Sequence, residues 1–71
     1  MNTNLISFIK EKRKSLGINQ IELAQKSGVG LRFVRDLEQG KKSLQMDKVN
    51  QVLELFGGQL GVVKKQFEEN E

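Results

Sequence analysis

Cysteine and histidine are both absent from this 71-residue chain. Without cysteine there is no disulfide framework, no thiol nucleophile and no thiolate metal site. Without histidine the chain also lacks the commonest metal ligand and the usual general base near neutral pH. We therefore expect neither an enzyme nor a protein with a metal or other cofactor. The serines that have no histidine to activate them are Ser7, Ser15, Ser27 and Ser43.

Long apolar runs are also lacking, because none approaches the roughly 18 residues that a membrane span requires. The amino terminus does not have the charged-then-apolar layout of a signal peptide. We expect a cytoplasmic protein that makes no use of a membrane. A chain of this length suits one small domain, which buries only about 60% of its unfolded surface.

Positive charge is present but unevenly distributed. The net charge is +3, and residues 10–48 hold ten of the twelve Lys and Arg residues against five acids. Residues 49–71 hold two basic residues against four acids. A basic block suits a polyanionic partner such as nucleic acid, although a solvated helical face can look similar. Charge alone therefore needs support from geometry.

Apolar residues recur with helical spacing in four segments, which predicts an all-α fold. Asn19 and Glu22 have the spacing of a capping box at the start of the second segment. Glycines follow the segments as natural helix stops. The predicted helices cover about residues 3–15, 20–27, 30–40 and 45–56.

The second and third predicted helices are separated by residues 28–30 alone. Two helices joined so tightly must cross steeply. Ala24 is small enough to allow close approach, and Gly28 can supply a left-handed turn. Val34 and Leu37 then fill the angle between the helices. This pattern predicts a helix-turn-helix.

The segments "LGINQIELAQKSGV" and "VRDLEQGKK" resemble the phage-repressor and Cro-like helix-turn-helix family. With the first and fourth helices, the resemblance covers about residues 4–57. It implies a repressor-like DNA-binding domain over residues 1–58 and recognition of double-stranded operator DNA. The sequence departs from the family pattern at Ser27, where an apolar residue is usual, and at Phe33, where a small polar one is common.

Two opposite charges interrupt apolar faces of the predicted helices. Arg13 falls on the stripe of Ile9 and Leu16, and Glu38 follows Val34 by four residues. An unpaired buried charge is costly, so both side chains either reach solvent or meet each other. The family's known Arg–Glu pair falls on these two positions, and we therefore expect Arg13 and Glu38 to pair.

If Val34 and Leu37 face inward, the opposite side of the third helix is free for a major groove. Arg32 suits a bidentate contact to guanine, and Leu31 can touch a thymine methyl. Asp36 can accept a hydrogen bond from cytosine, or merely restrain Arg32 four residues earlier. The predicted reading residues, at the leading end, outer face and flank, are Gly30, Leu31, Arg32, Arg35 and Asp36.

Phosphate contacts are expected from residues around that helix, including Arg35 as an alternative to a base contact. Gln20 matches the glutamine with which the resembling family grips the DNA backbone, and a helix amino terminus favours an anion. Lys41 and Lys42 follow the Gly40 stop and can reach phosphates on the other side. The alternative for both lysines is ordinary solvated charge.

The segment "QLGVVKK" is β-prone, but a lone strand does not persist in an all-helical monomer. We predict that residues 59–65 pair with the same segment of a second copy and form a homodimer. Residues 66–71 are predicted to be a flexible tail, and a disordered tail is also the alternative for 59–63. The expected dimer contacts are Leu55, Leu60, Val62 and Val63.

A helical domain followed directly by a dimerising strand is most similar to the HipB-type antitoxins, as is the stretch "SGVGLRFVRDLEQGKKSLQMDKVNQVLELFG". This resemblance implies a homodimer that represses its own operon and binds a HipA-type Ser/Thr kinase toxin. A stand-alone repressor and a restriction-modification controller are alternatives with the same fold. A protein-interaction module that does not bind DNA is an alternative of another class.

Overall fold

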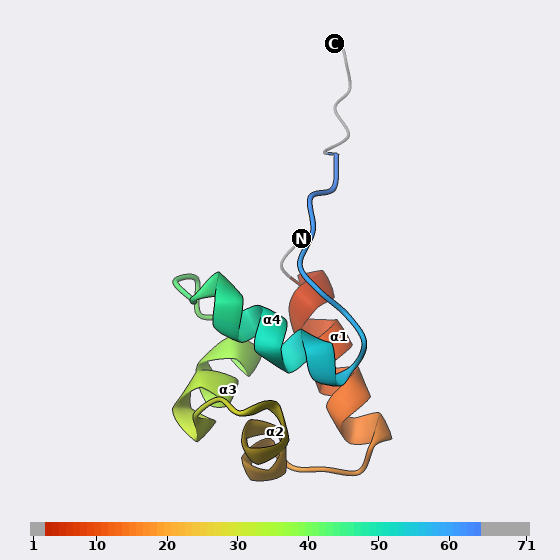
Figure 1. Cartoon of the computed structure of the whole chain (residues 1–71), viewed down its shortest axis with the longest axis vertical. Helices are drawn as coiled ribbons and strands as arrows, with labels where there is room; N and C mark the ends of the chain where they lie inside the picture. The colour runs from red at the N-terminus through yellow and green to blue at the C-terminus, as the bar shows by residue number, and fades with distance from the viewer. Residues whose placement is uncertain (1–2, 65–71) are drawn as a thin grey trace.

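The computed structural model describes residues 3–64 and folds them into four helices (Figure 1). The prediction of a four-helix, all-α domain is confirmed, and each boundary lies within a few residues of the expected one. None of these helices has the length and apolarity that crossing a bilayer requires. The helices are α1 (Thr3–Ser15), α2 (Gln20–Ser27), α3 (Leu31–Glu38) and α4 (Met46–Leu55).

One hydrophobic core joins the four helices. The α2 helix packs against both α3 and α4, and α1 packs against α3. Leu16, which the sequence placed on the apolar stripe of the first helix, is 57% exposed and lies outside this core. The buried apolar side chains are Ile9, Leu23, Ala24, Val34, Leu37, Val49, Val52 and Leu53.

The turn between α2 and α3 is fixed by local hydrogen bonds. Asn19 and Glu22 form the capping box, with each side chain accepting from the other residue's backbone N–H at 2.8 and 2.9 Å. Gly28 ends α2 with φ at 81°, a conformation that favours glycine. Gln51 of α4 donates its Nε2 to the carbonyls of Ser27 and Gly28, at 3.1 and 3.3 Å. The fourth helix therefore holds the turn of the helix-turn-helix in place.

The segment after α4 leaves the domain as an extended arm, at the end opposite α2 and α3 (Figure 1). No strand is present in the described residues 59–64, so the predicted strand receives no support from this part of the chain. A strand requires a second backbone to accept and donate its hydrogen bonds, and a single chain offers none here. Lys65 and the predicted tail, residues 66–71, lie outside the described residues.

Candidate nucleic-acid interface

A buried ion pair joins α1 to α3. The guanidinium of Arg13 donates to both carboxylate oxygens of Glu38, from Nε at 2.7 Å and from Nη2 at 3.0 Å. Its Nη1 donates to the carbonyl of Ile18 at 3.1 Å. Glu38 is only 5% exposed, so this two-pronged geometry satisfies a charge that has almost no contact with water. The structure thus brings together the two opposite charges noted in the sequence.

Gln20 adds α2 to the same network. Its Nε2 donates to Oε1 of Glu38 at 3.0 Å, a contact that the sequence pattern does not indicate. An amide nitrogen carries two hydrogens, so the second N–H of Gln20 can still donate to a phosphate. Glu38, the last residue of α3, therefore fixes the first residue of α2 relative to the carboxyl-terminal end of α3. A DNA contact made by Gln20 would therefore have a fixed position relative to α3.

The environment of Glu38 has opposing effects on the pKa of its carboxyl group. Burial raises the pKa of Glu38, but hydrogen bonds from Arg13 and Gln20 outweigh burial and hold it below its ordinary value. In return, the hydrogen bond to Glu38 raises the pKa of Arg13. Both shifts favour the charged pair in the folded protein.

The ion pair should make stability depend on pH in the acidic range. The pKa of Glu38 is lower in the folded protein than in the unfolded chain. The ionised carboxylate therefore contributes its full share to the free energy of unfolding above the unfolded-state pKa. This contribution is lost as the pH falls through the folded-state pKa. We expect the free energy of unfolding to fall more steeply below about pH 4.5 in the parent than in Glu38→Gln, which cannot titrate at this position. Urea unfolding across a pH series measures both slopes, and equal slopes would contradict the assignment.

The outer face of α3 carries exposed polar side chains over a firmly anchored inner face. Val34 and Leu37 are fully buried, as the sequence pattern required. Arg32 and Arg35 are exposed to solvent on the same short helix. Leu31 is half-buried and packs its inner side against the core. Because Val34 and Leu37 hold α3 against the core, its two arginines are exposed at fixed positions on the surface.

Asp36 pairs with Lys41 rather than with Arg32. The Lys41 Nζ lies 3.5 Å from Oδ2 of Asp36, and the Lys41 backbone N–H donates to the Asp36 carbonyl at 2.9 Å. An ion pair this exposed contributes about 0 to 1 kcal/mol, so DNA can displace it at little cost. Two of the residues expected to contact DNA separately are therefore neighbours.

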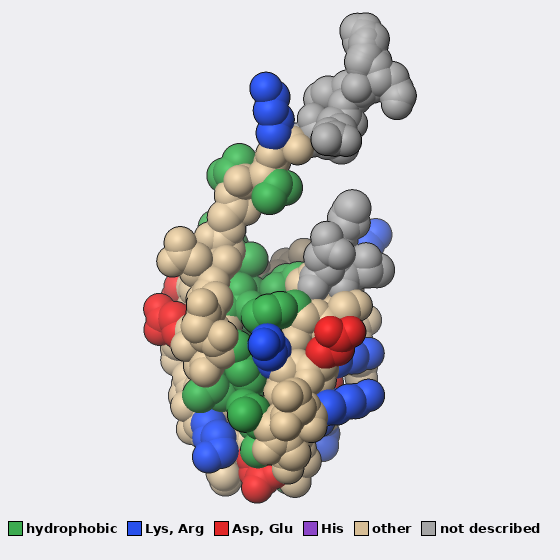
Figure 2. Space-filling model, turned by 90° about the vertical axis from the view of Figure 1, so that its right-hand side faces the viewer, with side chains coloured by type: hydrophobic (Ala, Val, Ile, Leu, Met, Phe, Trp, Pro, Cys, Tyr) green, Lys and Arg blue, Asp and Glu red, His purple; other side chains and the backbone are tan. Residues whose placement is uncertain are grey.

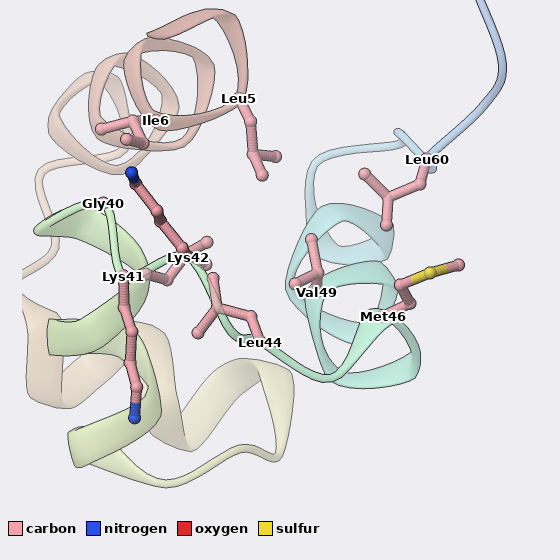
Figure 3. A pocket seen from close by; sticks show the side chains of 10 residues that line it. Leu5, Ile6, Gly40, Lys41, Lys42, Leu44, Met46, Val49 and Leu60 are labelled. Carbon is pink, nitrogen blue, oxygen red and sulfur yellow. The ribbon is translucent and has the colours of Figure 1, made fainter. Parts of the chain in front are cut away.

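Lys41 and Lys42 diverge from each other although they are adjacent in sequence. Figure 3 shows Lys41 running along α3, whereas Lys42 points toward Ile6 of α1 across an open groove. The structure therefore does not bring these two lysines together as one clamp. Gly40, with φ at 83°, produces the sharp turn that precedes them.

A shallow notch of about 360 Å³ separates the amino-terminal ends of α2 and α3. Three of the expected DNA-contacting residues meet here, namely Gln20, Leu31 and Arg35. Ile21 also lines the notch and is 51% exposed, and it was not among the residues predicted to contact DNA. Its position at the start of α2, off the face of the buried Leu23, was the available signal. The notch combines cationic, amide and apolar groups, which suits the edge of a nucleic-acid backbone.

The residues expected at a dimer interface lie at the end of α4 and on the arm. Val62 and Val63 are 100% and 85% exposed, and Leu55 is 37% exposed. Leu60 differs, because it packs against the core of its own chain and donates its N–H to Asn50 Oδ1 at 2.7 Å. Hydrophobic side chains also gather on the face beside this arm (Figure 2).

Comparison with known proteins agrees with the helix-turn-helix seen in the structure. The family model described as helix-turn-helix matches residues 9–63, which include α2, α3 and α4. An uncharacterised HTH-type transcriptional regulator of Sinorhizobium fredii, y4mF, is 42% identical over 57 residues. The match covers 80% of this chain and 75% of that protein. No solved structure matches the chain.

Proposed function

This chain belongs to the helix-turn-helix family of DNA-binding transcription regulators, and we propose that it is a repressor that reads a specific operator through α3. The observation that carries the proposal is the outer face of α3. Its exposed Arg32 and Arg35 stand on a helix whose inner side chains, Val34 and Leu37, are completely buried. A helix held in this way can enter a major groove as a rigid element.

Base reading is assigned to the leading end and the outer face of α3. The planar guanidinium of Arg32 matches the two acceptors of guanine, O6 and N7. Leu31, with its partly exposed side chain, can contact a thymine methyl. Asp36 can accept from the amino group of cytosine once the weak pair with Lys41 opens. Gly30 has no side chain, so it allows the duplex close to the start of α3.

Phosphate contacts orient the domain but carry no sequence information. Gln20 and Arg35 flank the notch between α2 and α3, where a phosphate would sit close to the positive end of α2. Because Gln20 also binds Glu38, a phosphate held there sets the depth of α3 in the groove. Lys41 and Lys42 contribute positive charge from the far end of α3.

The repressor acts in this proposal as a cytoplasmic homodimer, joined by its C-terminal arms. The exposed Val62 and Val63 support this proposal, because pairing would remove their largely solvated apolar side chains from water. The position of the arm also supports it, since an interface opposite α2 and α3 leaves both reading helices free (Figure 1). Two copies present a symmetric reader to a symmetric operator.

We further propose that the protein is the antitoxin of a HipA-type Ser/Thr kinase and represses its own operon. This step rests on the resemblance of residues 27–57, followed directly by the arm, to HipB-type antitoxins. A reading frame for a kinase-like protein beside the gene would support it. A gene that stands alone, or one beside a restriction enzyme, would favour the stand-alone repressor or the restriction-modification controller.

Substitutions at Arg32 and Lys42 should separate base reading from phosphate binding. Arg32→Ala should lose roughly 1 to 3 kcal/mol of binding on the selected operator and relax one base position. Lys42→Ala should weaken binding to all duplexes alike and reduce the slope of log K against log salt by about one. Titrations on operator and scrambled duplexes at several salt concentrations measure both effects.

The matched control for these titrations is Lys14→Ala, an exposed lysine near the end of α1. It removes the same charge as Lys42→Ala from a helix that makes no proposed DNA contact. Equal loss of specificity from Arg32→Ala and Lys42→Ala would mean that α3 does not present the face assigned here.

A further inference from the structure

An apolar groove of about 390 Å³ opens between the amino-terminal end of α1, the connection from α3 to α4, and the arm. Figure 3 shows Leu5, Leu44, Met46, Val49 and Leu60 around it. Met46 is 68% exposed, and nothing within residues 3–64 fills the space. Apolar surface of this kind, which lies beside the carboxyl-terminal end of α3 and is edged by Lys41 and Lys42, is suited to a second protein surface.

The backbone of Leu60 determines which edge of the arm is free. Its N–H is already used, because it donates to Asn50 Oδ1 of its own α4 at 2.7 Å. In an extended segment, alternate residues direct their N–H and C=O groups to opposite edges. Leu60 and Val62 thus direct theirs toward one edge, and Gly61 and Val63 direct theirs toward the other. A second strand can therefore pair without displacing the bond to Asn50 along the edge of Gly61 and its alternate neighbours.

This restriction leaves few registers for an antiparallel pair related by twofold symmetry, because residues that form hydrogen bonds must oppose one another. Centring the pair on Gly61 sets Leu60 opposite the partner's Val62. Centring it on Val62 sets Leu60 opposite the partner's Lys64, and centring it on Leu60 sets Val62 opposite the partner's Gly58. Only the Gly61 register matches both inner apolar residues with apolar residues. In this register Leu60 and the partner's Val62 form a non-hydrogen-bonded pair, the type in which opposed side chains lie closest together.

The size of the contact shows why the groove must take part. Two strands of about five residues are marginal by themselves, and a stable protein interface buries roughly 1,200 to 2,000 Å². Leu60 lines the groove, and in the Gly61 register the partner's Val62 lies beside it on the same face. We expect the partner's strand to cover Leu5 and Met46 as well, because they line the same groove. Hydrogen bonds fix the register, and the groove supplies the buried apolar area.

We propose that two arms pair antiparallel about Gly61, so that the partner's Val62 covers the groove beside Leu60. This inference rests on the proposed homodimer and specifies its register and its apolar contact surface. It also assigns Asn50 a positioning role, because the hydrogen bond from Leu60 to Asn50 sets the edge that each arm presents. The separation of the two α3 helices then depends on this register.

The absence of cysteine makes disulfide trapping a direct test, because an introduced cysteine is the only one in the chain. Gly61→Cys alone should form a covalent dimer, since opposed residues with hydrogen bonds lie about 5.5 Å apart between Cα atoms, within disulfide range. A Cβ at Gly61 would meet nothing within 4 Å, and its φ is not positive, so the substitution should not disturb the fold. A mixture of Leu60→Cys and Val62→Cys should form a mixed disulfide.

The single variants provide the controls. Val62→Cys alone and Leu60→Cys alone should stay largely uncrosslinked, because diagonal positions lie about 7 to 8 Å apart. Rapid crosslinking of either one alone would overturn the Gly61 register. Sedimentation of the parent protein tests the homodimer separately from the pairing of the arms about Gly61. A parent dimer that none of these variants traps refutes the paired arms, whereas a monomeric parent refutes the homodimer itself.

Charge placed in the groove tests the apolar contact. Met46→Glu should raise the dimer dissociation constant at least tenfold, because the partner's apolar arm would cover a carboxylate. Leu16→Glu is the matched control, since Leu16 is also an exposed apolar residue but lies at the far end of α1, outside the groove. Equal dissociation constants for the two variants would show that the groove takes no part in the dimer.

Discussion

Replacing Glu38 with alanine should lower the free energy of unfolding by about 3 to 5 kcal/mol. The substitution strands the guanidinium of Arg13, whose other hydrogen bond is to the carbonyl of Ile18, and removes the acceptor of Gln20. A domain of 71 residues has a total stability of roughly 4 to 10 kcal/mol, so much of it would be lost. Urea unfolding followed by circular dichroism measures the change.

The double change Arg13→Met and Glu38→Leu is the informative control for this loss. It removes both charges while keeping the volume, so it should recover much of the stability. Asp36→Ala removes the exposed pair with Lys41 instead and should cost about 1 kcal/mol or less. A Glu38→Ala variant that unfolds like the parent would show that the pair has no structural role.

Deleting residues 59–71 should reduce operator affinity by orders of magnitude. A single small domain contacts one half-site, whereas two joined copies place their α3 helices about 34 Å apart, in successive major grooves. Losing the arm turns a bivalent reader into a monovalent one. The deletion also removes Leu60 from the core of its own chain, so we expect a less stable as well as a largely monomeric domain.

The shorter deletion, residues 66–71, leaves residues 59–64 intact and should keep both the dimer and operator binding nearly unchanged. Sedimentation, circular dichroism and operator titration on the two truncated proteins separate loss of folding from loss of pairing. If the longer truncation stays dimeric and binds tightly, the interface lies elsewhere, for example at α4, and the arm has no part in binding.

Local sequence signals were sufficient for the helices and for the turn between α2 and α3. Asn19, Glu22 and Gly28 act through neighbours only a few residues away, so their effect can be read without the fold. The opposite charges of Arg13 and Glu38 could also be recognised, because each interrupts an apolar face and a buried charge requires a partner. In these cases the residues that determine the structure can be recognised from helix-capping preferences and from the spacing of apolar positions.

Other contacts depend on packing that periodicity does not specify. Gln20 reaches Glu38 across 18 positions because α2 and α3 meet at that point, and a solvated glutamine would have had the same sequence pattern. Asp36 pairs with Lys41 because the chain turns at Gly40, beyond the helix in which Arg32 would be the expected neighbour. The β-propensity of residues 59–64 would need a second backbone to pair with, and the described part of the chain forms no strand there.

Selection of bound duplexes from a random pool, followed by competition between the selected and scrambled duplexes, is the most direct test of DNA reading through α3. We predict a symmetric site with two half-sites about one helical turn apart, bound at least 10³-fold more tightly than scrambled DNA at physiological salt. Failure to enrich any sequence, with weak binding that disappears as salt is raised, would contradict the proposal that this protein is a sequence-specific repressor.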